Sequence, residues 1–71
     1  MSDQVAVGIT VNGEDKTYAT APTVAELLAE LGLPEKGIAV AIDGAVCPRG
    51  RWSEPVNRGA NIEILTAVQG G

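Results

Sequence analysis

The sequence predicts a single α+β domain in which one helix packs across a sheet. Three observations indicate this: alternating apolar residues near the start of the chain, an amphipathic helix in the middle, and further alternating segments toward the end. The chain has 71 residues, of which 45% are hydrophobic. That is enough for one modest core and leaves no length for a separate catalytic domain.

The first predicted element is a hairpin. Apolar residues in the segment 5–11 alternate with small or polar ones, which is the pattern of a strand with one buried face. Asn12-Gly13 follows at once and tolerates the positive φ angles of a tight turn. Residues 14–20, EDKTYAT, are therefore the expected returning strand, with Tyr18 as its largest apolar body.

The stretch TVAELLAELGLP has clear signals for both ends of a helix. Thr23 as N-cap and Glu26 three residues later form a capping box. Gly32 suits a left-handed C-terminal cap, Leu33 can fold back on the helix, and Pro34 prevents continuation. A helix of about three turns is expected, with one apolar face at the i, i+3, i+4 and i+7 positions: Val24, Leu27, Leu28 and Leu31.

The second half of the chain predicts the rest of the sheet. Alternating apolar residues at 38–42 indicate a strand that enters a second tight turn at Asp43-Gly44. Residues 45–48 give a short strand, residues 49–61 an irregular loop, and residues 62–67, IEILTA, a last strand. Hairpins with one helix laid across them form a sheet-and-helix layer.

Composition argues against several classes of function. The chain contains no histidine, so it has no ordinary imidazole base, no serine-histidine pair and no histidine metal ligand. A net charge of -4 argues against nucleic-acid binding and favours a basic protein partner. One cysteine allows no intrachain disulfide and fits the cytoplasm. No segment approaches the ~20 apolar residues of a membrane span, and the acidic start MSDQVAVG is unlike an export signal.

Two side chains could bind or react. Cys47 is interpreted as a small, semi-buried apolar residue. Arg49 and Arg51 lie close to it in sequence and could favour a thiolate, so a reactive thiol is the alternative. Trp52 is interpreted as a packing anchor for the loop rather than as a ligand platform, because a small core needs large side chains.

The sequence ends in ILTAVQGG, so residues 1–66 are expected to form the domain and residues 67–71 a flexible tail. Five residues can span at most ~17 Å, which is enough to reach a buried site in another protein. Neither Gly70 nor Gly71 has a β-carbon to obstruct a narrow channel. A frayed terminus or an added extension is the alternative interpretation.

Several of these segments together resemble the ThiS family of sulfur carriers in thiamin thiazole synthesis. They are TVAELLAELGL, VAIDG, RWSEPV and the terminal ILTAVQGG, so that the resemblance runs from Val11 to Gly71. It implies a β-grasp, ubiquitin-like fold, which is a mixed sheet with one main helix packed across it. The chain departs from the family at Ala60, where an acid is common, and at Cys47, where an apolar residue is more usual.

The resemblance implies a carrier that is not itself an enzyme and binds no cofactor or metal. An E1-like ThiF-type enzyme would adenylate the Gly71 carboxylate with ATP. Sulfur from a persulfide donor protein would then give a thiocarboxylate, and a ThiG-type thiazole synthase would receive the sulfur. Val68, Gln69 and Gly70 would thread into these partners. The carrier would be a monomer, and the exposed sheet face near the last strand would dock.

Three other interpretations remain open. The first is a MoaD-like carrier for molybdopterin synthesis, although those relatives tend to have prolines before the glycine pair and TAVQGG has none. The second is a ubiquitin-like tag whose Gly71 forms an isopeptide bond with lysine. The third is a β-grasp interaction domain whose terminus has no function.

Overall fold

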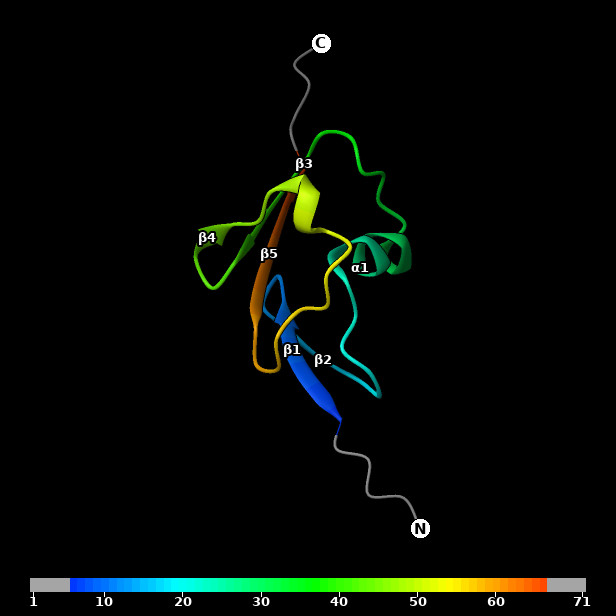
Figure 1. Cartoon of the computed structure of the whole chain (residues 1–71), viewed down its shortest axis with the longest axis vertical. Coiled ribbons are helices and arrows are strands. Elements are labelled where there is room, and N and C mark those ends of the chain that lie inside the picture. Colours follow the sequence, from blue (N-terminus) through cyan, green and yellow to red (C-terminus); the bar gives the residue numbers. More distant parts are fainter. Residues whose placement is uncertain (1–5, 67–71) are drawn as a thin grey trace.

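The structure, a computed structural model, describes residues 6–66. Its elements follow the predicted order (Figure 1). They are β1 (Val7–Val11), β2 (Glu14–Tyr18), α1 (Val24–Leu31), β3 (Ile38–Ile42), β4 (Ala45–Val46), the short 3₁₀ helix η1 (Arg49–Arg51) and β5 (Asn61–Thr66). Residue 67, which was expected in the last strand, and the predicted tail 67–71 lie outside the described residues.

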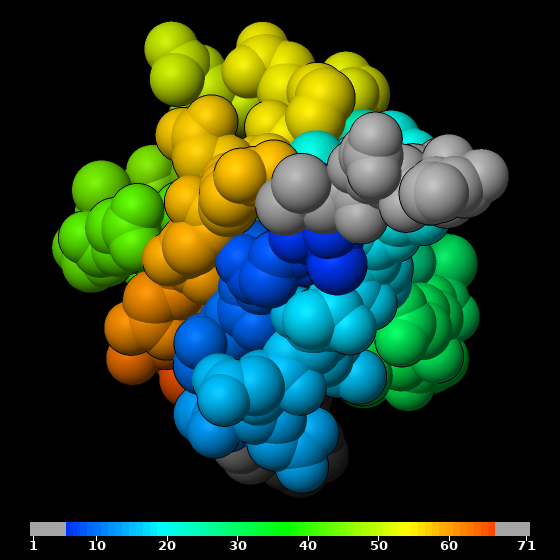
Figure 2. Space-filling view, turned by 90° about the horizontal axis from the view of Figure 1, so that it is seen from below, coloured from blue at the N-terminus to red at the C-terminus, as the bar shows by residue number. Residues whose placement is uncertain are grey.

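The five strands form one mixed sheet in the order β2-β1-β5-β3-β4. The pairing of β1 with β5 is parallel and the other pairings are antiparallel. In the space-filling view β5, in orange, lies between β1, in blue, and the β4 region, in green (Figure 2). With α1 as its one helix, this mixed sheet confirms the predicted α+β, β-grasp fold.

The N-terminus of α1 has the predicted capping box. Thr23 is extended, with φ -91° and ψ 163°, and its Oγ1 accepts a hydrogen bond from the Glu26 backbone N–H at 3.0 Å. In return, Glu26 Oε1 accepts one from the Thr23 N–H at 2.9 Å. Both bonds satisfy donors that have no partner within the helix.

The C-terminus of α1 has the predicted cap, although the helix is shorter than the three turns expected. Gly32 is left-handed, with φ 73°, and the Leu33 N–H donates to Leu28 O at 2.9 Å. The helix has eight residues, a little over two turns rather than three. Leu31 is 38% exposed, so it does not share the burial of the other three apolar residues on its face. The chain turns at Gly32, and Leu33 packs against the core instead.

The core lies between the inner face of the sheet, α1 and the loop before β5. Trp52 is 5% exposed, which confirms its interpretation as a packing anchor. Its Nε1–H donates to Cys47 O at 3.0 Å, so the one polar atom of the ring is satisfied. The buried hydrophobic residues that form the core are Ile9, Val11, Val24, Leu27, Leu28, Val40, Trp52, Val56, Ala60, Ile62 and Ile64.

Candidate functional site

The strand that leads into residues 67–71 is held in the middle of the sheet. β5 pairs with β3 from Ile62 to Thr66 and with β1 at Asn61 and Ile62. Ile62 and Ile64 are buried, while the alternate residues are exposed. The body of the domain therefore fixes the position of β5 up to Thr66. Because the predicted site residues Val68, Gln69, Gly70 and Gly71 lie outside the described residues, their roles stay predictions.

The turn between β1 and β2 holds β5 from one side. Asn12 and Gly13 have φ angles of 51° and 83°, which confirms the predicted tight turn. The Asn12 N–H donates to Ile62 O at 2.9 Å. Asn12 Oδ1 in turn accepts a hydrogen bond from the Ile64 N–H at 2.8 Å. One turn residue thus makes two hydrogen bonds to the last strand.

The turn between β3 and β4 holds β5 from the other side. Asp43 and Gly44 have φ angles of 53° and 84°. The Asp43 N–H donates to Asn61 O at 2.8 Å, and Asp43 Oδ1 accepts from the Asn61 N–H at 2.9 Å. The sequence predicted both turns but not these contacts. The available signal was the Asn or Asp at the first turn position, since such side chains accept backbone hydrogen bonds.

An apolar surface lies beside the end of β5. Leu65 and Val46 are 63% and 82% exposed. Leu65 is paired with Ala39 and Val46 with Ala41, so these four residues, here called the outer patch, share one face of the sheet. The outer patch borders a hollow of about 340 Å³ that Trp52 also lines. It matches in position the sheet face that was expected to dock a partner, and docking there stays a prediction.

Cys47 packs against the core and is partly buried, as its interpretation as an apolar residue expects. Of the two nearby arginines, Arg49 donates to Glu35 O and has its guanidinium 5.3 Å from the centre of the Trp52 ring. Arg51 lines a second hollow, of about 250 Å³, together with Cys47. Arg49 thus contacts the loop after α1 and Trp52. Packing against the core explains the position of Cys47.

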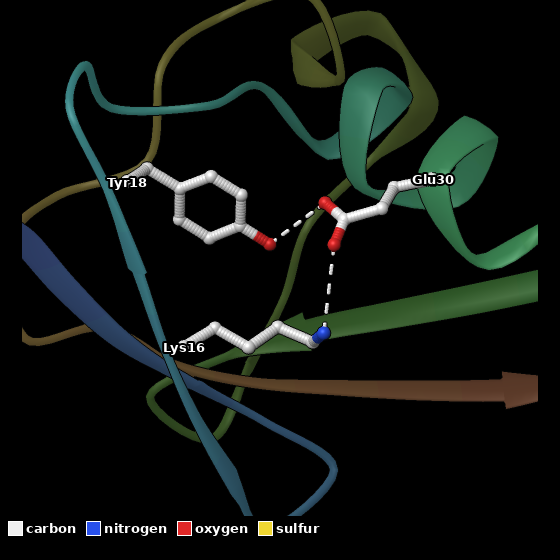
Figure 3. A network of polar contacts seen from close by, with 3 residues as sticks. All are labelled: Lys16, Tyr18 and Glu30. Carbon is white, nitrogen blue, oxygen red and sulfur yellow. Dashed lines mark hydrogen bonds and ion pairs between the residues drawn. The ribbon is translucent and has the colours of Figure 1, made fainter.

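The clearest titration shift is at the other edge of the sheet. Partial burial, reinforced by a hydrogen bond to Glu30 and by its charge, raises the pKa of Tyr18 to about 12. The Tyr18 hydroxyl donates to Glu30 Oε1 at 2.8 Å, and Lys16 Nζ lies 3.5 Å from Glu30 Oε2 (Figure 3). A phenol with a raised pKa is a weak acid at neutral pH, so we interpret this network as a link between β2 and α1.

Residues 6–66 show neither a metal-binding group nor a membrane-spanning helix. No group of three or more cysteine or acidic side chains there is arranged to hold a metal ion. Within the same range, α1 is too short to cross a membrane.

Comparisons with known proteins agree with this geometry. The ThiS family model matches residues 9–71. A crystal structure of the thiamine biosynthesis protein ThiS from Geobacter metallireducens has a TM-score of 0.71 and 31% sequence identity, covering 90% of this chain and 99% of that one. A thiazole synthase from Paramagnetospirillum magneticum is 31% identical over 64 residues, or 89% of this chain. The chain spans 20% of the length of that relative. Because the family model covers most of the chain and a ThiS structure shares its fold, the chain belongs to the ThiS family.

Proposed function

We propose that this chain is a sulfur carrier of thiamin biosynthesis and that the Gly71 carboxylate takes up and delivers the sulfur. One observation supports this most directly: the family match extends through the Gly-Gly pair to Gly71. The position of β5 adds support, because a strand held on both sides leads straight into residues 67–71.

The proposed chemistry begins with activation of the carboxylate. An α-carboxyl group has a pKa of about 3.3 to 3.7, so at neutral pH it is ionised and is a poor electrophile. A carboxylate oxygen attacks the α-phosphorus of ATP and pyrophosphate leaves, which gives an acyl adenylate. The terminal sulfur of a donor persulfide then attacks the carbonyl carbon and expels AMP. A second thiol attacks the donor sulfur of the resulting acyl disulfide, which forms a disulfide with the donor and leaves the thiocarboxylate at Gly71.

The ATP chemistry is assigned to an E1-like, ThiF-type partner. The N-terminus of α1 is the part of a small domain that could bind phosphate through its backbone amides. Two of those amides already have partners within the chain: the Ala25 N–H donates to Trp52 O at 3.0 Å and the Glu26 N–H to Thr23 Oγ1 at 3.0 Å. The carrier would therefore contribute the carboxylate, and the partner would bind the nucleotide.

The recipient of the sulfur is proposed to be a ThiG-type thiazole synthase. A segment of the Paramagnetospirillum magneticum thiazole synthase is related to 89% of this chain, which supports a functional link between carrier and synthase. The outer patch is the proposed contact surface for these partners, because exposed Leu65 and Val46 lie beside the strand that delivers Gly71. Val68, Gln69 and Gly70 would enter the active sites of both enzymes.

The decisive experiment measures the intact mass of the carrier after incubation with a ThiF-type enzyme, ATP and a persulfide donor. We expect a mass increase equal to the replacement of one oxygen by sulfur. Oxidation of Met1, Cys47 or Trp52 gives almost the same increase, so fragment ions must place the change at Gly71. Omitting ATP should prevent it. Conjugates with lysines of other proteins, in place of the thiocarboxylate, would instead support the tag interpretation.

Two variants test the assignment to Gly71. One residue added after Gly71 moves the carboxylate by about 3.5 Å and should abolish activation without unfolding the domain. Sulfur transfer that persists in this extended chain would exclude Gly71. The matched variant, Cys47→Ala, should transfer sulfur normally, and its failure in a folded protein would favour the reactive-thiol alternative.

A further inference from the structure

On the side of β5 that faces β1, Asn12 makes the side-chain contact that lies nearest to residues 67–71. The parallel ladder between β1 and β5 pairs Thr10 with Asn61 and Val11 with Ile62. Ile64 lies beyond the last of these pairs, and its N–H is satisfied by Asn12 Oδ1 at 2.8 Å. The carboxamide therefore replaces the backbone acceptor that a longer β1 would have supplied.

The same chemistry occurs at the other end of the strand. Asp43 Oδ1 accepts the Asn61 N–H at 2.9 Å. Asn61 is the first residue of β5 and Ile64 is the fourth of its six, so the two side chains hold opposite halves of the strand. Asp43 thus provides an internal comparison, since its contact lies further from residues 67–71.

We propose that Asn12 is a positioning residue for activation of the carrier: its carboxamide oxygen fixes Ile64 and so sets the position of the end of β5, from which residues 67–71 continue. This inference rests on the proposed function, because the position matters only if Gly71 must reach a partner's active site. Asn12 would touch neither ATP nor the reacting carboxylate and would act through β5.

The remaining contacts of the strand explain why this bond should matter. Without the Asn12 oxygen, the end of β5 is held by β3 alone, through the pairs of Glu63 with Ala41 and Leu65 with Ala39. A strand held along one side can pivot about that side. A displacement of Thr66 moves the point from which residues 67–71 continue, and reactions that depend on the placement of two groups lose rate steeply when one is displaced.

The test compares three variants in a ThiF-type enzyme assay of ATP–pyrophosphate exchange and in amide hydrogen exchange. Asn12→Gly keeps a residue that tolerates the positive φ of 51° but removes the acceptor. Asn12→Asp keeps both the turn and an oxygen acceptor. Asp43→Gly removes the corresponding acceptor at the start of β5, where φ is 53°.

We expect Asn12→Gly to raise exchange of the Ile64 and Leu65 amides by about tenfold or more, because the Ile64 donor loses its partner. The kcat of the ThiF-type enzyme for pyrophosphate exchange should fall by about tenfold with this variant. The KM for the carrier should be nearly unchanged, because the outer patch is intact. Asn12→Asp should restore both values to within about twofold of the native chain. Asp43→Gly should raise exchange at Asn61 and keep the native kcat.

Three results would overturn the proposal: unchanged protection of Ile64 in Asn12→Gly, equal losses of kcat in Asn12→Gly and Asp43→Gly, or failure of Asn12→Asp to restore kcat. Equal losses would show that any weakening of β5 slows activation, and failure of Asn12→Asp would show that the oxygen acceptor is not what activation requires. A native chain that is not activated at all would refute the proposed function and the kinetic part of this inference with it. Hydrogen exchange at Ile64 would still decide whether Asn12 holds the end of β5.

Discussion

The two hairpins beside β5 are alike at their turns and different at their outer strands. In each turn two consecutive residues have positive φ, and the first of them gives β5 one backbone donor and one side-chain acceptor. β2 pairs with β1 over five residue pairs, whereas β4 pairs with β3 over only two. The outer strand of the second hairpin therefore has less of its own ladder to hold it.

In each hairpin, an aromatic side chain also makes a hydrogen bond that helps to hold the outer strand. Tyr18, at the end of β2, bonds to Glu30 at an exposed position of α1. Trp52 is buried, and its Nε1–H bonds to Cys47 O just after β4. A long edge strand thus needs only a surface contact, while a strand of two residues depends on a side chain in the core.

If this comparison is right, Trp52→Ala should destabilise the domain by about 3–5 kcal/mol, because it removes a large buried ring beside the short strand. Trp52→Phe keeps much of the packing and removes the donor to Cys47 O, so its loss should be nearer 1–2 kcal/mol. Urea unfolding followed by far-UV circular dichroism measures both. Equal losses would show that the hydrogen bond, not the buried ring, secures the second hairpin.

The two turns should respond equally to the loss of their glycines. Gly13 and Gly44 have φ angles of 83° and 84°, and a β-carbon added at either would meet no atom within 4 Å. Gly13→Ala and Gly44→Ala should therefore each cost about 1 kcal/mol through backbone strain alone. Denaturant titration of the two variants side by side tests this. A clear difference between them would mean that the turns are not equivalent.

Tyr18→Phe should cost least at neutral pH, about 0.5–1 kcal/mol, because the lost hydrogen bond is near the surface. Its pH dependence is distinctive. The folded pKa of Tyr18, about 12, lies above its usual value of 10.0. The folded chain therefore binds this proton more tightly, and the stabilisation is complete below pH 10 and lost as the pH rises to about 12.

The stability advantage of the native protein over Tyr18→Phe should consequently decrease steadily between pH 10 and 12, the range set by the usual and folded pKa values. Unfolding experiments on both proteins across this range provide the measurement. The informative quantity is the difference between the two proteins at each pH, because effects that both share cancel in it. A constant difference would show that Tyr18 keeps its usual pKa.

The ends of α1 could be predicted because the groups that define them are close in sequence. Thr23 and Glu26 are three residues apart, and Gly32 needs only its own freedom to adopt positive φ. The exposure of Leu31 was not predicted. Periodicity shows which face of the helix a residue lies on, but it does not show whether the core extends beneath that residue. Leu33, after the cap, packs against the core.

The contacts of β5 could not be predicted, because their partners are distant in sequence. Asn12 and Ile64 are 52 residues apart, and Asp43 and Asn61 are 18 apart. The dipeptides Asn12-Gly13 and Asp43-Gly44 indicate a turn but not what lies beside it. For the site itself, the role of Gly71 is a prediction from the sequence, and the described residues show what precedes residues 67–71: a central strand, an apolar neighbouring face and two turn residues that hold the strand.

The central place of β5 also bears on how the protein is made. The last strand of residues 6–66 to leave the ribosome is the one that joins the β1–β2 hairpin to the β3–β4 hairpin. A nascent or truncated chain that stops before Asn61 has two hairpins with no shared strand, and closing contacts over such sequence separations is slow. Such fragments would expose apolar surface and be open to proteases. Chains that include β5 would therefore accumulate in cells, and chains that lack it would be degraded.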